Sequence, residues 1–244
     1  MSAWWDGLKA QFVLNFINDN RWQSLVSGLG VTLQITVFAV IVGILLGALV
    51  ATVRSTWDKS GEEMGRRKSP AYYLLKGLNV ICKIYLTVIR GTPVVVQLMI
   101  SYFIIFATSK NAVVVAIFAF GLNSAAYVAE IIRGGIMSID EGQFEAGRSL
   151  GFNYPQTMIH IILPQVFKAV LPALLNEFIT LVKETSVAGY VGIMDLTKAG
   201  DVIRSRTYSA FMPLFAVAGI YLVIVIILET VFGRLERRLR QNER

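Results

Sequence analysis

Polar and ionisable side chains inside apolar stretches are the residues of this sequence that could do chemistry. Asn176 and Glu177 fall well within one such stretch, beyond Pro172, and Glu130 lies near the end of another. Ionisable groups at membrane depth are costly and by default face a bundle interior or a water-filled path. A carboxylate at Glu177 could therefore meet a cationic or zwitterionic ligand. The equally weighted alternative is an interhelical hydrogen bond to a partner subunit.

Other polar residues could join the same path. Arg90 lies at a depth similar to that of Glu130. We predict an ion pair between them, which favours a clamp between helices over contact with a substrate. Gln97, Asn123 and Tyr127 could hydrogen-bond the ammonium or carboxylate of a small ligand, or could equally join two helices. The candidate lining of a substrate pathway comprises Arg90, Thr92, Gln97, Asn123, Tyr127, Glu130, Asn176 and Glu177.

The sequence offers little for catalysis. His160 is the only histidine, so no metal site or acid–base constellation can be built around histidines. No G-x-x-x-x-G-K-[ST] loop, the pattern that cradles nucleotide phosphates, occurs in the chain. We therefore expect no catalytic residue, no metal and no cofactor in this chain, and we expect it not to be an enzyme.

Composition indicates a membrane protein. Of the 244 residues, 55% are hydrophobic and only 16% are charged, which is too apolar for an ordinary soluble domain. A helix needs roughly 20 apolar residues to cross a hydrocarbon layer about 30 Å thick. The predicted fold is therefore an all-α integral membrane protein with about five transmembrane helices. The transmembrane domain is 25–233, with spans at about 25–53, 74–107, 112–133, 156–183 and 209–232.

The two ends of the chain differ in character. Residues 1–24 carry Trp4, Leu8, Phe12 and Phe16 at four-residue spacing, which predicts an amphipathic helix lying in the outer membrane interface. Lys and Arg gather in the segment after the first span and in the tail 234–244. By the positive-inside rule both lie in the cytoplasm, so the amino terminus is outside. This bias, with lipid headgroups, explains the formal charge of +7 better than nucleic-acid binding does.

A small polar segment, 137–155, interrupts the apolar runs on the cytoplasmic side. The S-x-x-E pattern from Ser138 to Glu141 predicts a helix start, and Gly151 is suited to a left-handed helix end. Asn153 then predicts a second cap, with Pro155 in the following first turn. The small residues at 146 and 147 would let another protein approach closely. This predicts a docking element, although a plain turn between two spans is the alternative.

The order of residues in this segment resembles the EAA signature of ABC-transporter permease subunits. Glu145 is followed by the small residues Ala146 and Gly147, by Gly151 six positions later, and by an I-x-L-P group at 161–164. Gly147 departs from the commoner alanine. Further blocks resemble those of polar amino acid permeases of the histidine, glutamine, arginine and glutamate type. They are RGTP at 90–93 with Gln97, NSAAYVAEIIRGGI at 123–136, and LVKETSV at 181–187.

The resemblance implies the type I importer permease fold and a set of partners. These are a cytoplasmic ATPase dimer that binds ATP and Mg, a second permease that is identical or homologous, and an external amino acid-binding protein. In this reading the chain lies in a bacterial inner membrane. The coupling helix would span Asp140–Leu150, and Lys183, Thr185 and Ser186 would mark an external gate. The residues implied in ATPase coupling are Asp140, Phe144, Glu145, Ala146, Gly147, Arg148, Leu150 and Gly151.

Two alternatives remain beside this reading. One is a secondary carrier or channel for small polar solutes driven by an ion gradient, in which Glu130 or Glu177 would titrate. The other is a membrane scaffold or an enzyme subunit without transport, which leaves the coupling signature unexplained. The stretch Trp57–Pro70 is longer than the family pattern needs. We interpret it as a solvated insertion, with a regulatory role as the less favoured possibility.

Overall fold

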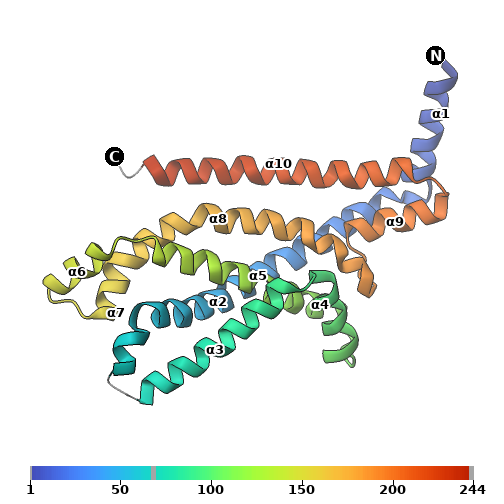
Figure 1. Cartoon of the computed structure of the whole chain (residues 1–244). Coiled ribbons are helices and arrows are strands. Elements are labelled where there is room, and N and C mark those ends of the chain that lie inside the picture. The colour runs from blue at the N-terminus through green and yellow to red at the C-terminus, as the bar shows by residue number, and fades with distance from the viewer. Residues whose placement is uncertain (1, 67–69, 242–244) are drawn as a thin grey trace. The chain divides into compact units, whose positions relative to one another are not determined.

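The computed structural model of the chain describes residues 2–66 and 70–241, in which helices account for nearly all of the secondary structure and no strand occurs. It divides into two compact units. The first comprises Met1–Ala39, Val94–Phe120 and Ile179–Val231, and the second comprises Val40–Pro93, Gly121–Phe178 and Phe232–Arg244. The α-helices are α1 (Ser2–Phe12), α2 (Trp22–Arg66), α3 (Pro70–Gly91), α4 (Val94–Ile100), α5 (Ala112–Met137), α6 (Glu141–Ser149), α7 (Tyr154–Thr157), α8 (Leu163–Glu184), α9 (Leu196–Thr207) and α10 (Phe211–Gln241) (Figure 1).

Five helices in the described residues are long and apolar enough to cross a membrane, which confirms the all-α membrane fold. They run over Trp22–Glu62, Pro70–Gly91, Ala112–Met137, Tyr154–Val191 and Phe211–Leu239. The stretch 74–107, predicted as one span, is instead interrupted at Thr92 and Pro93, between the end of α3 and the start of α4 (Figure 1). Proline has no backbone N–H and disfavours helical geometry in the preceding residue, so the helix stops there.

The helix α2 is much longer than a bilayer requires. Its 45 residues correspond to roughly 68 Å at 1.5 Å per residue, against about 30 Å of hydrocarbon. Residues 54–66, which we name the α2 extension, continue the helix past the predicted span. The predicted insertion Trp57–Pro70 therefore belongs to α2 as far as Arg66, and residues 67–69 lie outside the described residues. Likewise, the predicted tail 234–244 continues α10 as far as Gln241, and 242–244 lie outside the described residues.

In the second unit, α2 lies unusually close to α5. A Cβ atom added at Gly43 would lie 2.9 Å from Oγ of Ser124, and one added at Gly47 would lie 2.7 Å from Cγ1 of Val128. Both distances are too short for real contacts, so only glycine fits at either position. The G-x-x-x-G spacing thus allows the two backbones to approach, as small residues do in membrane helices.

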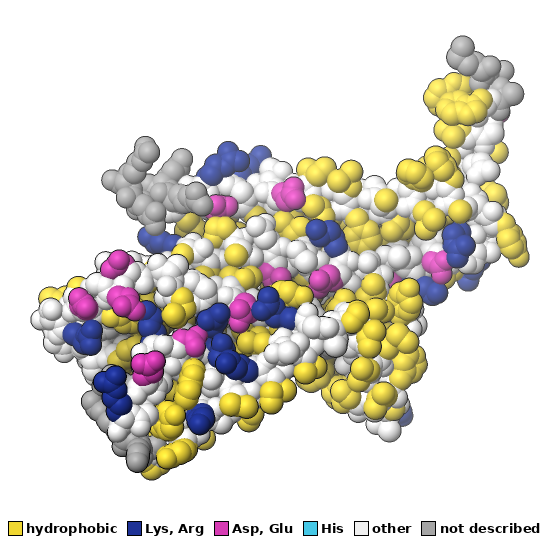
Figure 2. All heavy atoms as spheres, in the orientation of Figure 1, with side chains coloured by type: hydrophobic (Ala, Val, Ile, Leu, Met, Phe, Trp, Pro, Cys, Tyr) yellow, Lys and Arg dark blue, Asp and Glu magenta, His cyan; other side chains and the backbone are white. Residues whose placement is uncertain are grey.

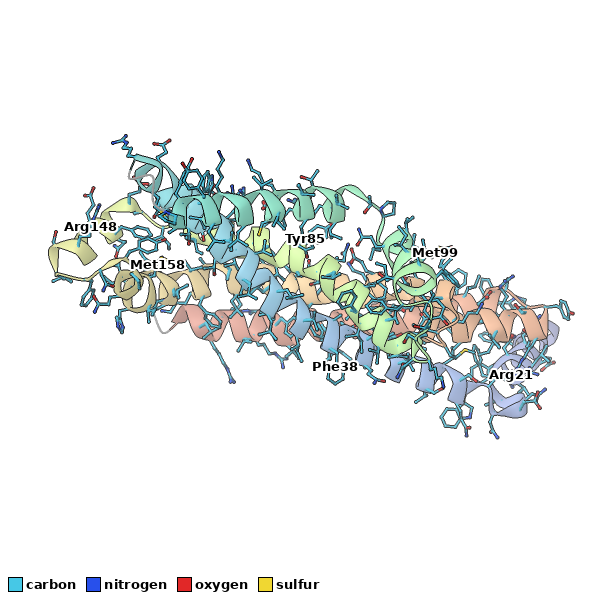
Figure 3. The ribbon with its side chains drawn as sticks, turned by 90° about the horizontal axis from the view of Figure 1, so that it is seen from below. Arg21, Phe38, Tyr85, Met99, Arg148 and Met158 are labelled. Carbon is cyan, nitrogen blue, oxygen red and sulfur yellow. The ribbon has the colours of Figure 1, made fainter. Side chains whose placement is uncertain are left out.

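The helix α3 packs on α5 in the same unit. Leu86 lies with Ala126 and Ala129 in a buried apolar cluster. The Tyr85 hydroxyl donates a hydrogen bond to the carbonyl of Leu122, and Figure 3 shows Tyr85 beside α5. Because a half-buried phenol is favoured by a hydrogen-bond partner, this contact helps to set where α3 lies along α5.

In the first unit, α1 turns across the direction of α10 (Figure 1). The turn between α1 and α2 uses Asp19 and Asn20, whose φ values of 54° and 52° lie in the left-handed region that Asp and Asn tolerate. Trp4 and Phe12 are 63% and 50% exposed. Aromatic side chains exposed in this way are expected at a membrane interface.

The sequence did not predict α9. Asp195 caps this helix by accepting hydrogen bonds from the backbone N–H groups of Thr197 and Lys198. Its first residue, Leu196, donates its N–H to the Thr32 hydroxyl of α2 at 3.1 Å. Burial raises the pKa of the Asp195 carboxyl, while the hydrogen bonds that it accepts oppose the shift. A buried apolar cluster completes the packing, formed by Phe16, Leu25, Leu196, Ala199, Ile203 and Val217.

Candidate functional site

The predicted docking element is a helix, a tight turn and a second helix in the second unit. The first helix, α6, begins differently from the prediction. Its N-cap is Asp140, whose Oδ1 accepts a hydrogen bond from the N–H of Gly142 at 2.7 Å. The predicted cap at Ser138 is wrong, because that hydroxyl donates to the carbonyl of Gly135 at the end of α5. Ser138 is therefore used to finish one helix and Asp140 to start the next.

The turn after α6 follows the prediction. Gly151 has φ of 82°, a conformation that a side chain would resist. The N–H of Phe152 reaches the carbonyl of Gly147 at 3.0 Å, and the N–H of Gly151 reaches that of Arg148 at 2.9 Å. These bonds satisfy carbonyl groups that a helix end leaves free.

The second helix, α7, begins as predicted at Asn153. The Asn153 side chain accepts a hydrogen bond from the N–H of Gln156 at 3.0 Å, and the Gln156 side chain accepts one from the N–H of Asn153 at 2.9 Å. Pro155 occupies the first turn, where its missing N–H has no cost. Local hydrogen bonds thus hold the start of α6, the turn and the start of α7.

One face of α6 is open to a partner. Leu150, which follows α6 directly, is 72% exposed. Figure 2 shows Lys, Arg, Asp and Glu side chains gathered over α6 and the nearby end of α2, and Figure 3 shows Arg148 on the outer part of the loop. The exposed face comprises Glu141, Gly142, Gln143, Glu145, Ala146, Arg148, Ser149 and Leu150.

Gly147 does not belong to this exposed face. It is buried against Thr157, and a Cβ atom added at Gly147 would lie 2.6 Å from both Oγ1 and Cγ2 of that side chain. The expected bare surface therefore holds for Ala146 and is wrong for Gly147. The small size of Gly147 allows α6 to pack closely on α7 within this chain. Thr157 was not a candidate, because nothing in the sequence marks it as the neighbour of Gly147.

The predicted pair between Arg90 and Glu130 is confirmed. Nη1 of Arg90 lies 3.6 Å from Oε2 of Glu130, and its guanidinium lies 5.7 Å from the centre of the Tyr127 ring. Arg133, one helical turn after Glu130, contacts the same carboxylate at 3.5 Å and Asp58 of the α2 extension at 2.9 Å. The structure thus joins these residues in a chain of alternating charge.

Glu177 has a partner within the chain. The Ser124 hydroxyl of α5 donates to Oε1 of Glu177 at 2.9 Å, and the buried Asn123 precedes Ser124. The interhelical hydrogen bond considered from the sequence therefore exists, but it is made inside one chain. Ser124 was missed, although a hydroxyl in the middle of an apolar helix is a sign of such a bond. Neighbouring Asn176 is exposed.

The remaining pathway candidates, Thr92 and Gln97, lie apart from these polar contacts. Thr92 is exposed, and its hydroxyl donates to the carbonyl of Val88 at 2.8 Å. Gln97 is half-buried on α4 in the first unit. Neither residue belongs to the alternating charged chain of the second unit.

The three predicted gate residues lie in the first unit, Lys183 in the last turn of α8 and Thr185 and Ser186 in the 3₁₀ helix Thr185–Val191 that follows it. Thr185 is buried, and its hydroxyl donates to the carbonyl of Val182 at 2.8 Å. The same hydroxyl lies 3.5 Å from the hydroxyl of Thr36. Lys183 is exposed and Ser186 is half-buried. Those two line a cavity of about 330 Å³ together with Thr197, Leu214, Val217, Ala218 and Tyr221.

Comparison with known proteins extends these findings. A family described as "Binding-protein-dependent transport system inner membrane component" matches residues 71–241, which include the whole of α6 and α7. The arginine transport system permease protein ArtQ of Bacillus subtilis is 36% identical over 222 residues, covering 90% of this chain and 94% of ArtQ. The putative glutamine transport system permease protein GlnP of Rickettsia felis is 33% identical over 221 residues, covering 89% and 94%.

A solved structure agrees with the fold over nearly the full length. The crystal structure of an amino acid ABC transporter with histidines contains a chain 37% identical to this one. The two superpose with a TM-score of 0.77, covering 91% of this chain and 98% of that one.

Proposed function

The chain belongs to the family of binding-protein-dependent transport system inner membrane components and is a permease subunit of an ABC importer; from this premise we propose that it imports polar amino acids through coupling of α6 to a cytoplasmic ATPase. The observation that carries the proposal is the helix–turn–helix of α6 and α7, with one face of α6 exposed and the N-terminus of each helix capped by a side chain. The relatives named for arginine and glutamine transport support the substrate class. Family membership does not favour an ion-driven carrier.

The proposed coupling is mechanical. ATP and Mg bind to the partner ATPase dimer, and this chain contributes no group to the hydrolysis. The exposed face of α6, with Glu145, Ala146, Arg148 and Leu150, docks in a groove of the ATPase. When the ATPase dimer closes, α6 moves with it and the attached helices change the side to which the pathway opens.

The proposed assembly and orientation follow from the same loop. Two permease chains, identical or homologous, pair with two ATPase subunits in a bacterial inner membrane, and an external binding protein delivers the amino acid. The loop 137–155 and the basic carboxyl-terminal end lie in the cytoplasm, and the amino terminus lies outside. The excess of Lys and Arg after the first span and at the tail supports this orientation.

Within the pathway, Glu177 is the proposed contact for the ligand ammonium or a cationic side chain. It lies inside a membrane-length helix and is half-buried, with one oxygen held by Ser124 at 2.9 Å. A carboxylate retained at such depth is costly unless it is paired or functional. The pairing to a single neutral hydroxyl leaves capacity for a ligand, because a carboxylate offers about four acceptor sites.

The assembly is tested by native mass spectrometry of the complex that copurifies with the tagged chain. We expect two ATPase subunits with two permease chains, and the masses distinguish a homodimer from a heterodimer. Reconstituted vesicles should import labelled arginine or glutamine only when ATP reaches the ATPase. A chain that purifies alone and imports amino acids on an ion gradient would contradict the proposal.

The role of Glu177 is tested separately in these vesicles. Glu177→Gln should lower uptake of both amino acids if the carboxylate meets the ammonium that they share, and uptake of arginine alone if it meets the cationic side chain. Ser124→Ala is the matched control, since it removes the hydrogen bond and keeps the carboxylate. Equal uptake of both amino acids by Glu177→Gln and the parent chain would remove Glu177 from the pathway.

A further inference from the structure

The α2 extension is not a freely solvated segment. The Lys59 side chain is only 13% exposed, and lysine is rarely this buried unless it is paired. Its Nζ lies 3.3 Å from Oε1 of Glu141 and 4.9 Å from the centre of the Phe144 ring. Both partners belong to α6. One cation of α2 therefore contacts the docking helix at two points.

The two contacts of Lys59 differ in their exposure to solvent. The Glu141 side chain is 86% exposed, so solvent screens its ion pair with Lys59. The Phe144 ring is half-buried and packs against an apolar cluster of Ile136, Ile162, Val166 and Val170. A cation over an aromatic ring is attracted more strongly where water is excluded. The contact with Phe144 therefore involves the less exposed of the two partners.

The same face of the α2 extension also reaches the second helix of the loop. The ring of Tyr154 stacks on that of Phe144, with centroids 6.2 Å apart and planes inclined by 15°. The Tyr154 hydroxyl lies near the side chain of Thr56, which is three residues before Lys59 and hence on the same helix face. A cavity of about 390 Å³ lies beside these contacts, lined by Lys59, Ser60, Glu141, Phe144, Glu145, Arg148, Tyr154 and Thr157.

The residue beside Lys59 ties the α2 extension to the spans. Asp58 contacts Arg133 of α5 at 2.9 Å, Arg133 contacts Glu130 at 3.5 Å, and Glu130 contacts Arg90 of α3 at 3.6 Å. Consecutive helix residues point about 100° apart, so Asp58 and Lys59 can serve different neighbours. The α2 extension is thus held to α3 and α5 on one side and to α6 on the other.

We propose that the α2 extension is a second connection between the coupling helix and the membrane spans, in which Lys59 is the positioning residue for α6. This inference rests on the proposed coupling function of α6. Along the chain, α6 is joined only to α5, through residues 138–140, and to α7, through a turn at Gly151. Through Lys59, a displacement of α6 is passed directly to α2 as well.

The test uses the complete complex, reconstituted with its ATPase and binding protein. The variant is Lys59→Met, which keeps the length of the side chain and removes its charge. Lys59→Arg retains a cation for the Phe144 ring and should restore function. The matched control is Lys76→Met on α3, because Lys76 also lies over an aromatic ring, that of Tyr72 at 6.0 Å, without belonging to this contact set.

The readout is the number of amino acids imported per ATP hydrolysed, measured after the ATPase content of each complex has been verified. We expect Lys59→Met to keep its ATPase subunits and its basal hydrolysis, and to import roughly three- to tenfold less per ATP, in line with the loss of one cation–π contact. Lys59→Arg should recover most of the parental value, and Lys76→Met should equal it. A general structural defect would lower hydrolysis and import together.

A second variant keeps the inference testable if Lys59→Met does not assemble. Phe144→Leu removes the ring from the α6 side, should produce the same loss, and should add little to Lys59→Met, since interacting residues are not additive. Parental import per ATP in an assembled Lys59→Met or Phe144→Leu complex would overturn the inference. So would a Lys59→Arg complex as impaired as Lys59→Met. Failure of the coupling function itself would show differently, as a parental complex that lacks an ATPase.

Discussion

The contact between Gly147 and Thr157 predicts that Gly147→Ala destabilises the parent chain but stabilises a chain that carries Thr157→Ala. In the parent chain, Gly147→Ala places a methyl group 2.6 Å from both Oγ1 and Cγ2 of Thr157, so the neighbouring helices must separate. Overpacking of this kind costs about 1–3 kcal/mol. Against this, alanine is favoured over glycine in a helix by about 1 kcal/mol. The net expectation is a loss of roughly 1 kcal/mol.

In a Thr157→Ala background the balance reverses. Both clashing atoms are gone, and the truncated hydroxyl makes no hydrogen bond in the structure, so its removal leaves no partner unsatisfied. Gly147→Ala should then stabilise the fold by up to about 1 kcal/mol, through helix propensity alone. The coupling energy between the two positions is therefore expected at about 1–3 kcal/mol.

Thermal unfolding of the four purified complexes, at one scan rate and one detergent concentration, measures this cycle. For a chain of this size, 1 kcal/mol corresponds to a shift of about 2–4 °C in Tm. We expect Gly147→Ala to lower Tm by that amount in the parent and to raise it in Thr157→Ala. Thr157→Ser is the control, because it keeps Oγ1 and should keep part of the clash. A shift of the same sign in both backgrounds would refute the packing argument.

Two further predictions concern helix starts. Asp140→Ala should destabilise α6 by about 1 kcal/mol and lower import, whereas Ser138→Ala should leave the start of α6 intact. Thermal unfolding and uptake measure these effects, and equal effects of the two variants would contradict the Asp140 cap. The pKa of Asp195 is raised in the folded state, so the protonated carboxyl stabilises the fold. This contribution to stability is fully present below the unfolded pKa of about 3.9 and is lost as pH rises through the folded pKa. Asp195→Asn keeps a capping oxygen and should reduce the loss of stability with rising pH, measured as Tm in unfolding scans at several pH values. An unchanged dependence of Tm on pH would contradict the role of Asp195.

The elements predicted well from the sequence are those fixed by strong local signals. The long apolar runs predicted five membrane-length helices, since only a helix satisfies its own backbone hydrogen bonds in lipid. Gly151 and Asn153 were read correctly because a left-handed turn and an N-cap depend on a few neighbouring residues. The ion pair of Arg90 and Glu130 followed from their similar depth.

The misreadings arise where tertiary contacts decide. Ser138 and Asp140 both suit an N-cap, and only the position at which α5 ends selects Asp140. Gly147 reads as a bare surface until Thr157, ten residues later, is placed against it. The helix α9 is short and polar, and it owes its position to the buried Asp195 and to packing on distant segments, which no local pattern reports.

The alternating chain of Asp58, Arg133, Glu130 and Arg90 has a consequence for how voltage acts on the protein. Its two cations and two anions cancel, so the cluster carries no net charge. One uncompensated charge that crosses the full membrane field changes the energy by about 2.3 kcal/mol per 100 mV. A neutral cluster that moves as a body through the same field does no net electrical work. The cluster itself therefore adds no net electrical work when the helices that it joins change position.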